Sequence, residues 1–230
     1  MEVNVITIDG PSGSGKGTIS QLLASRLGYH YLDSGALYRL LALAAKRHKV
    51  SLDDIEDLAV LAAHMDIAFQ MNPEGGSPEV LLEGEDVTDQ IRDEEVGAGA
   101  SRVAAIAQVR KALLDRQRAF ARAPGLVADG RDMGTVVFPD ATIKIYLTAS
   151  PEERAQRRHN QLIGKGESVS LADLVEKVRS RDERDMNRDI SPLVAASDAI
   201  TVDTSGKSIP EVLEVVLDIV RHSEISVGTA

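Results

Sequence analysis

The chain has 230 residues, enough for one α/β domain with a buried core or for a core with a small insertion. Its net charge of −10 argues against a broad binding surface for a nucleic-acid polymer. It has no cysteine, which excludes disulfides, thiolate metal sites and thiol nucleophiles, and no apolar run approaches the roughly 18 residues of a membrane span. We expect a cytoplasmic monomer that binds no membrane.

The N-terminal part of the chain follows the order strand, glycine loop, helix, strand. Val3–Ile8 is a β-branched apolar run typical of a buried strand, and the glycine-rich Gly10–Gly17 must form a loop. From Thr18 the apolar residues recur at helical spacing until Gly28 supplies a stop. Tyr29–Leu32 predicts a second strand.

The middle of the chain interrupts this alternation with a small insertion. Ser51 is predicted to cap a helix, with Asp54 three residues later as an approximate capping box. The other predicted elements are a helix from about Ala36, short strands at Asp66–Gln70 and Val80–Glu85 around a turn at Pro73–Pro78, and two helices between about Glu94 and Ala123.

The C-terminal half returns to alternating strands and helices. The predicted strands are Leu126–Ala128, Ile143–Leu147 and Ala199–Val202, and the predicted helices begin at Ser150, Ser170 and Ser208. Ser150 is followed by proline and by Glu153, and Ser208 by Glu211, so both serines have the spacing of a capping box. The alternation predicts an α/β fold with a five-stranded parallel sheet covered by helices on both faces.

The glycine loop after the first strand has the composition of a phosphate-binding loop. Its candidate ATP-binding residues are Gly10, Pro11, Ser12, Gly13, Ser14, Gly15, Lys16, Gly17 and Thr18. Glycines allow successive backbone N–H groups to point at a phosphate, and Lys16 would reach the β- and γ-phosphates. Gly17 stands where the general pattern has Ser or Thr, so we expect Thr18 to hold Mg²⁺. The alternative is a glycine-rich turn that binds nothing.

Arginines are concentrated in one segment of this acidic chain. There are 18 arginines against 8 lysines, and seven of the arginines lie within Arg154–Arg188. A guanidinium binds phosphate oxygens in a bidentate manner, so this segment predicts a compact polyanion as its ligand. A phosphorylated acceptor is itself anionic and requires charge neutralisation more than a general base. The residues therefore favour a P-loop kinase with a small phosphorylated acceptor.

Five sequence stretches resemble the bacterial cytidylate kinases. They are ITIDGPSGSGKGT (Ile6–Thr18), LDSGALYR (Leu32–Arg39), LEGEDVT (Leu82–Thr88), ADGRDMGTVVFPDA (Ala128–Ala141) and RDERDMNR (Arg181–Arg188). The resemblance implies a P-loop kinase fold over residues 1–230, with an inserted acceptor-binding subdomain at about 34–95 and a helical lid at about 154–168. It implies transfer of the γ-phosphate of ATP to CMP, and to dCMP, in pyrimidine nucleotide metabolism.

The resemblance also assigns residues to the acceptor. It places Ser34 and Arg39 at the acceptor phosphate, Ser101, Arg110, Asp132 and Arg188 around the base, and Arg181 and Asp185 at the sugar and phosphate. The residues themselves leave alternatives, because Ser34 could cap the next helix. Ser101 and Arg110 could be ordinary polar residues on a helix surface.

The segment Asp129-Gly130-Arg131-Asp132 follows a predicted strand and carries three candidate site residues. Asp129 has the position of a Walker B acid, which holds Mg²⁺ partly through water. Arg131 suits the acceptor phosphate, and Asp132 could accept a hydrogen bond from the amino group of cytosine. The residues that we expect to act on the transferring phosphoryl group are Lys16, Arg131, Arg157, Arg158 and Arg181.

Two arginine-bearing helices are predicted on either side of Gly164-Lys165-Gly166. Such a pair, joined by a glycine break, predicts a lid that closes on ATP and excludes water. The alternative is a solvated, salt-bridged helix face, since acidic residues alternate with the arginines. We expect this alternative for Arg154 and Arg184. We expect phosphate or substrate contact for Arg157, Arg158, Arg181 and Arg188.

Two other functions are compatible with parts of the pattern. One is a small P-loop kinase with another acceptor, such as AMP, shikimate or dephospho-coenzyme A; the base-recognition residues Asp132 and Arg188 argue against it. The other is a regulatory module that binds ATP to switch its conformation. A regulatory module needs no second anion site, and so the arginines beyond the phosphate loop argue against it.

Overall fold

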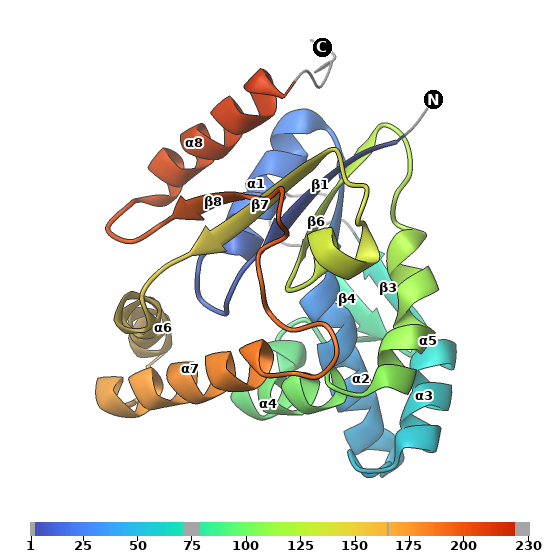
Figure 1. Cartoon of the computed structure of the whole chain (residues 1–230). Coiled ribbons are helices and arrows are strands. Elements are labelled where there is room, and N and C mark those ends of the chain that lie inside the picture. The colour runs from blue at the N-terminus through green and yellow to red at the C-terminus, as the bar shows by residue number, and fades with distance from the viewer. Residues whose placement is uncertain (1–2, 71–78, 165, 224–230) are drawn as a thin grey trace. The chain divides into compact units, whose positions relative to one another are not determined.

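The computed structural model describes residues 3–70, 79–164 and 166–223, which form two compact units (Figure 1). The first unit comprises the residues up to Asp33 and those from Gln117 onward, and the second comprises Ser34–Arg116. The predicted turn at Pro73–Pro78 lies outside the described residues. Over the described ranges, the helices are all too short or too polar to cross a membrane.

A five-stranded parallel sheet forms the centre of the first unit (Figure 1). In spatial order its strands are β2 (His30–Asp33), β6 (Gly125–Gly130), β1 (Asn4–Asp9), β7 (Ile143–Thr148) and β8 (Ile200–Asp203). Each neighbouring pair is parallel, so the predicted sheet is confirmed. Because the strands are parallel, the carboxyl ends of β1, β2 and β6 share one edge, where α/β sheets bind ligands.

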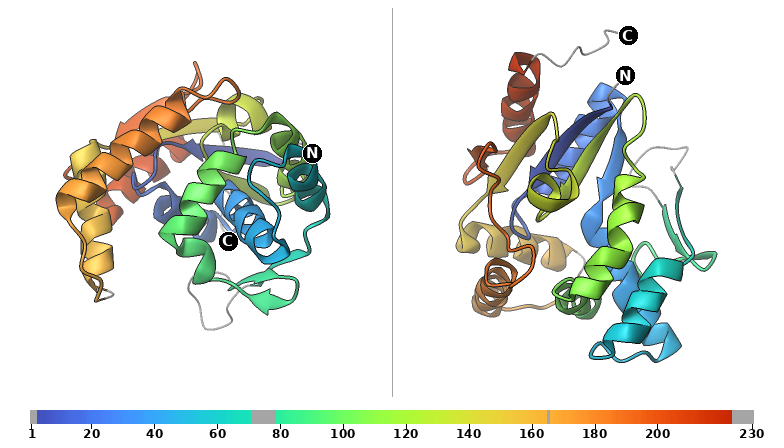
Figure 2. Two further views of the ribbon diagram at one scale, coloured as in Figure 1. Left: turned by 90° about the horizontal axis from the view of Figure 1, so that it is seen from below. Right: turned by 45° about the vertical axis from the view of Figure 1, so that its right-hand side comes forward.

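Among the described residues of the first unit, long helices accompany this sheet. They are α1 (Lys16–Leu27), α6 (Pro151–Gly164), α7 (Leu171–Met186) and α8 (Ile209–His222). Apolar residues of α1 and α8, such as Leu23 and Val216, pack with Ile8 and Ile145 of the central strands in one buried cluster. The helices α6 and α7 lie side by side and bury a smaller cluster that includes Leu162 (Figure 2).

The helix boundaries test the predicted caps. The capping box of Ser208 and Glu211 is present, and Gly28 ends α1, as predicted. Ser150 also caps α6, since its hydroxyl accepts a hydrogen bond from Glu153 N at 3.2 Å. The Glu153 carboxylate does not complete a capping box, because the backbone N–H of Ser150 donates to Ser205 Oγ at 3.4 Å, while the carboxylate accepts from Gly206 N at 3.3 Å.

The second unit combines helices with a small antiparallel sheet. Its helices are α2 (Ser34–His48), α3 (Ile55–His64), α4 (Glu94–Val103) and the start of α5 (Ala107–Arg118), together with the 3₁₀ turn η1 (Gln90–Arg92). Its sheet has the order β3 (Ile67–Gln70), β4 (Glu79–Leu82) and β5 (Glu85–Asp86). Leu37, Leu41 and Ala44 of α2 are fully buried, which makes this helix the centre of the unit.

Two predictions about the second unit were wrong. The predicted strand Val80–Glu85 is a hairpin, because Glu83 and Gly84 have φ values of 55° and 80° and turn the chain between β4 and β5. This is the geometry of a two-residue turn that suits twisted strands. The cap of α3 is Asp54, whose carboxylate accepts from Asp57 N at 3.1 Å, and Ser51 belongs to the preceding turn.

Candidate active site

The glycine loop joins the carboxyl end of β1 to the first turn of α1. A side chain at Gly10 would lie 2.0 Å from the carbonyl oxygen of Leu147, so this position accepts only glycine. Helix α1 begins at Lys16, two residues before the predicted start, with Gly15 as its N-cap. The loop therefore delivers the unpaired N–H groups of a helix N-terminus to one place, which is the arrangement of an anion site.

Lys16 extends across the loop toward Asp129. Its Nζ lies 3.8 Å from Asp129 Oδ1 and 3.5 Å from Pro11 O. Burial and the nearby Arg131 guanidinium lower the pKa of Lys16 to about 8, although Asp129 and Asp33 act in the opposite direction. An ammonium group with weak carbonyl and carboxylate contacts is well suited to gain a phosphate oxygen as a stronger partner.

Asp129 is the candidate metal ligand of this edge. Its Oδ2 accepts a hydrogen bond from the Tyr31 hydroxyl at 3.4 Å, while its buried Oδ1 accepts none from the described residues. Burial, with a contribution from Asp33, raises the pKa of Asp129 to about 6, against the opposing effect of Lys16. A buried carboxylate oxygen with only a distant ammonium partner fits a cation beside the phosphate loop.

The composition of this edge suits a metal that carries few protein ligands. Gly17 lies against the carboxylate, since a side chain there would approach Asp129 Oδ2 to 3.2 Å. Thr18, the predicted hydroxyl ligand, is exposed at the start of α1. Within residues 3–70, 79–164 and 166–223, no cluster of three His, Asp or Glu side chains could hold a metal ion. Mg²⁺ bound mainly through phosphate and water needs no such cluster.

A buried carboxylate joins the predicted acceptor arginines. Asp185 is 1% exposed; its Oδ2 accepts a hydrogen bond from Arg131 Nε at 3.1 Å, and its Oδ1 pairs with Arg188. Burial alone would raise the pKa of Asp185, but the guanidiniums of Arg131, Arg188 and Arg181 outweigh burial and lower it. The structure thus brings these four predicted residues together within the first unit.

Sequence reasoning missed Asp9, the last residue of β1. Its carboxylate is buried and accepts hydrogen bonds from Met133 N at 2.9 Å and Gly134 N at 2.8 Å. These donors begin the π-helical turn η2 (Met133–Val137), directly after the buried Asp132. Burial raises the pKa of Asp9 to about 7, despite the two N–H donors. The sequence did contain a signal for this residue, because Asp9 is an acid at the end of an apolar run that predicts a buried strand.

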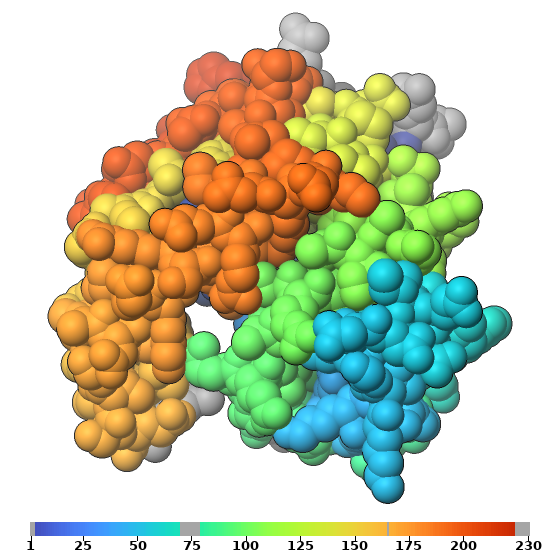
Figure 3. Space-filling view, turned by 60° about the horizontal axis from the view of Figure 1, so that its bottom comes forward, coloured from blue at the N-terminus to red at the C-terminus, as the bar shows by residue number. Residues whose placement is uncertain are grey.

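The arginines of α6 and α7 have different environments. Arg154 was expected on a solvated, salt-bridged face. The salt bridge to Asp182 is present, but the solvation was wrong, because Arg154 is 3% exposed and donates to Ser12 O at 3.1 Å. Its guanidinium makes four hydrogen bonds inside the protein, to Ala149 O, Ser12 O and the Asp182 carboxylate, which offsets the cost of burying its charge. Arg157 is half-buried and donates to backbone carbonyls of the loop, and Arg158 is half-buried on the same helix. Figure 3 shows α6 and α7 in contact.

The remaining predicted acceptor residues belong to the second unit. Ser34 is the first residue of α2 and is buried, and Arg39 donates to Ile91 O at 2.7 Å. Ser101 on α4 and Arg110 on α5 are also buried, which separates them from ordinary surface residues. The Arg110 guanidinium lies 5.7 Å from the centre of a tyrosine ring and donates to a backbone carbonyl at 3.2 Å. The predicted roles of these four residues stay predictions.

The chain resembles known proteins over nearly its whole length. The family model for cytidylate kinase matches residues 6–222. A cytidylate kinase from Marinomonas sp. is 63% identical over 92% of this chain and 93% of the relative, and one from Stutzerimonas stutzeri is 59% identical over 97% and 98%. The crystal structure of TT1252 from Thermus thermophilus, 22% identical, covers 98% of this chain and all of its own, with a TM-score of 0.50.

These matches extend over both units. The likeness to the solved structure concerns the fold alone. The five-stranded parallel sheet agrees with the predicted α/β fold. The matched residues 6–222 include the glycine loop, Asp129 near the end of β6 and the arginines of α6 and α7. The chain belongs to the cytidylate kinase family.

Proposed function

We propose that this protein transfers the γ-phosphate of ATP to CMP, giving CDP and ADP, and that it also accepts dCMP. Membership in the cytidylate kinase family supports this activity. The observation that carries the proposal is the buried Asp185 between the guanidiniums of Arg131 and Arg188, in the unit that also holds the phosphate loop. A kinase of phosphorylated acceptors needs two anion sites. The phosphate loop would supply the site for ATP, and the guanidiniums of Arg131 and Arg188 would supply the site for the acceptor.

The chemistry follows from charge. The acceptor phosphate is an anionic nucleophile, so no side chain has to remove a proton from it before it attacks the γ-phosphorus. The bond to the β-phosphate oxygen breaks as the new P–O bond forms, and ADP leaves. Lys16, Arg131 and Arg181 are the proposed cations at the transferring phosphoryl group, with Arg157 and Arg158 as further candidates. Fixed positive charge there stabilises the transition state by several kcal/mol.

Base recognition is assigned by donor and acceptor type. Asp132 would accept from the amino group of cytosine, and Ser101, Arg110 and Arg188 would donate to its acceptors. Uracil presents an oxygen where cytosine has the amino group, and so it would face the Asp132 carboxylate without a proton to share. Ser34 and Arg39 are proposed at the acceptor phosphate, and Asp185 at the sugar.

Mg²⁺ is the proposed cofactor, held by Asp129 and the Thr18 hydroxyl partly through water. The buried Asp129 Oδ1, which accepts no hydrogen bond from the described residues, supports this site. When bound, the metal would neutralise charge on the phosphates of ATP. We further propose residues 34–95 as the acceptor-binding subdomain and residues 154–168 as the lid. Residues 71–78 of the first range and Lys165 of the second lie outside the described residues. The proposed enzyme is a cytoplasmic monomer.

The test is ADP formation from Mg²⁺·ATP with one monophosphate at a time: CMP, dCMP, UMP and AMP. We expect ADP with CMP and dCMP, little with UMP, and none with AMP. ADP formed in the absence of any acceptor would instead identify an ATPase. Equal rates with all four monophosphates would exclude the proposed recognition of the base.

A pair of variants tests the base contact separately. Asp132→Asn presents an amide NH₂ that can donate to uracil O4, so the preference for CMP over UMP should fall at least tenfold. Asp140→Asn removes an exposed carboxylate and should keep the preference of the wild type. An unchanged preference in Asp132→Asn would exclude Asp132 from the base site.

A further inference from the structure

Three consecutive carbonyl groups of the phosphate loop face the arginines of α6. Arg154 Nη1 donates to Ser12 O at 3.1 Å. Arg157 Nη1 lies 3.3 Å from Ser14 O and 3.5 Å from Gly13 O. The outer side of the loop, formed by the carbonyls of Ser12, Gly13 and Ser14, therefore lies against two guanidiniums.

The directions of these carbonyl groups also fix the directions of the N–H groups on the inner side of the loop. In a trans peptide the C=O and the following N–H point in opposite directions. When the carbonyls of residues 12–14 point at α6, the N–H groups of Gly13, Ser14 and Gly15 must point away from it. On that side, Ser14 N lies 3.4 Å from Pro11 O, which Lys16 Nζ also approaches to 3.5 Å. Two donors converge there on one weakly bound oxygen, where a phosphate oxygen would be a stronger acceptor.

The two guanidiniums are anchored independently of the loop. Arg154 also donates to Ala149 O at 2.9 Å and pairs with Asp182 of α7. Arg157 also donates to Thr204 O at 2.7 Å. These partners lie outside the phosphate loop, so each arginine is held by contacts that the loop itself does not make.

A buried hydroxyl completes the contacts behind the loop. Thr204 follows β8 and is 1% exposed. Its Oγ1 lies 3.1 Å from Ser14 O and 3.1 Å from Thr148 O, and it accepts a hydrogen bond from Arg157 Nη1 at 3.1 Å. Thr204 is far from Ser14 in sequence, yet its hydroxyl binds the carbonyl oxygen of Ser14, as the Arg157 guanidinium also does.

We propose that Arg154, Arg157 and Thr204 are positioning residues that hold the carbonyls of the phosphate loop outward, so that its N–H groups face the donor phosphates. The proposal rests on the proposed function, since it takes ATP and ADP as the ligands of the loop. Residues that orient the loop strengthen binding of ADP and ATP alike. A direct contact of Arg157 with the γ-phosphate would favour ATP only, and this difference separates the two roles.

The sharpest variant is Thr204→Val, which removes the hydroxyl and keeps the shape of the side chain. We expect the Kd values of Mg²⁺·ADP and Mg²⁺·ATP to rise by the same factor, about tenfold, as for the loss of about one hydrogen bond to a charged group. The Kd of CMP should stay within twofold of the wild type. Thr204→Ser restores the hydroxyl and should restore ADP binding.

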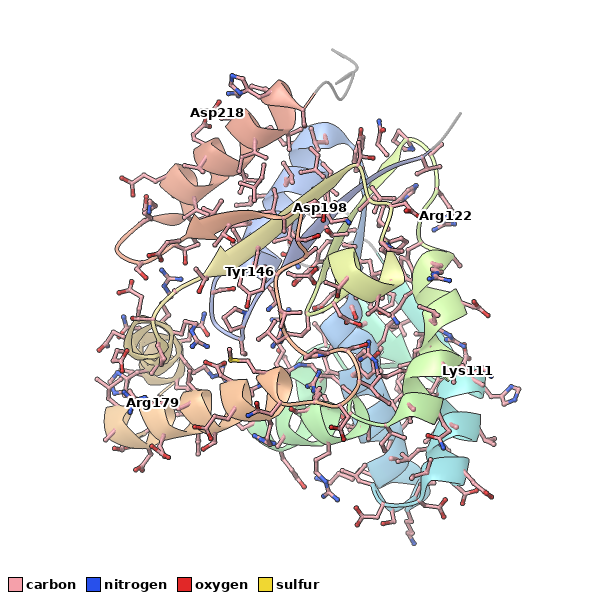
Figure 4. All side chains as sticks on the ribbon, viewed as in Figure 1. Lys111, Arg122, Tyr146, Arg179, Asp198 and Asp218 are labelled. Carbon is pink, nitrogen blue, oxygen red and sulfur yellow. The ribbon has the colours of Figure 1, made fainter. Side chains whose placement is uncertain are left out.

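Arg157→Gln gives a second measurement that does not depend on the first variant folding. It should also weaken ADP and ATP equally. Its control is Arg179→Gln on α7 (Figure 4), which removes an exposed guanidinium paired with Glu152 at 2.6 Å and should leave every Kd unchanged. Weakened ATP binding with normal ADP binding would overturn the proposal, as would unchanged ADP binding in Thr204→Val.

The wild-type enzyme separates this inference from the proposed function. If the wild type forms no ADP with CMP, the proposed function fails. If the wild type does so and the variants bind ADP normally, only the positioning role fails. Calorimetric titration with ADP measures the loop without turnover, so the second outcome does not depend on catalysis.

Discussion

The buried Asp9 predicts an unusual pH dependence of stability. Its carboxyl has a pKa of about 7 in the folded protein, against 3.8 as the ordinary value. Between these two pH values the folded protein holds a proton that the unfolded chain has released. Unfolding then releases a proton, so the free energy of unfolding falls as pH rises through this window. The contribution of the protonated Asp9 to stability is fully lost once the pH passes about 7.

The size of the effect follows from the shift. About three pKa units correspond to roughly 4 kcal/mol, at about 1.4 kcal/mol per unit. The burial of Asp9, at 5% exposure, is the leading cause, and the donors Met133 N and Gly134 N offset only part of it. Asp9→Asn cannot ionise. The wild type should therefore lose about 4 kcal/mol of stability relative to the variant between pH 4 and pH 8.

Urea unfolding of both proteins at steps of half a pH unit measures this difference directly. Asp129 also has a raised pKa and titrates in the same window, but it is present in both proteins and largely cancels in the difference. Asp140→Asn, at an exposed carboxylate, serves as the control. A difference that varies by less than about 1 kcal/mol would show that the two N–H donors compensate the burial of the Asp9 charge.

Three further predictions concern single residues. Asp185→Asn leaves the guanidiniums of Arg131 and Arg188 without their shared carboxylate and should cost about 3 kcal/mol in urea unfolding, whereas the exposed Asp189→Asn should change stability by about 0.5 kcal/mol or less. Ser208→Ala removes the capping box of α8 and should cost about 1 kcal/mol with an unchanged m-value. Lys16 loses its proton as pH rises through about 8, so the KM for ATP should increase above that pH, and Lys16→Arg should abolish the increase.

The fold was largely predictable because its signals are local. The apolar runs of β1, β6 and β7 and the serine caps of α6, α7 and α8 each occupy a few neighbouring residues. The errors arose where two local signals compete. Ser51 and Asp54 are both good caps, and the structure uses the one directly before the apolar face of α3. Glu83 adopts a positive φ that residue type does not indicate, so the turn between β4 and β5 was missed.

How far a site residue could be predicted from the sequence depends on the kind of group that it contacts. Residue type indicated that Arg131 and Asp185 both belong to the site, although the sequence assigned them to the substrate and did not predict that they pair with each other. Asp9 could not be assigned in this way, since its partners are the backbone N–H groups of Met133 and Gly134, 124 and 125 residues away in sequence. Every residue except proline carries the same N–H group, so the sequence does not identify which of them a buried carboxylate binds.

The same reason explains why the sequence predicted Arg157 at a phosphate and Arg154 on a solvated, salt-bridged helix face, and predicted neither at the loop carbonyls. An arginine near a phosphate loop can bind the phosphate, or it can bind the carbonyls that orient the loop, and both choices use the same donors. Residue type favours the first choice, because only the phosphate is charged. In this structure both arginines donate to loop carbonyls, and Arg154 is too buried to meet solvent. A pattern of arginines around a phosphate loop therefore predicts that the site binds an anion, and the structure is needed to decide which arginines position the loop.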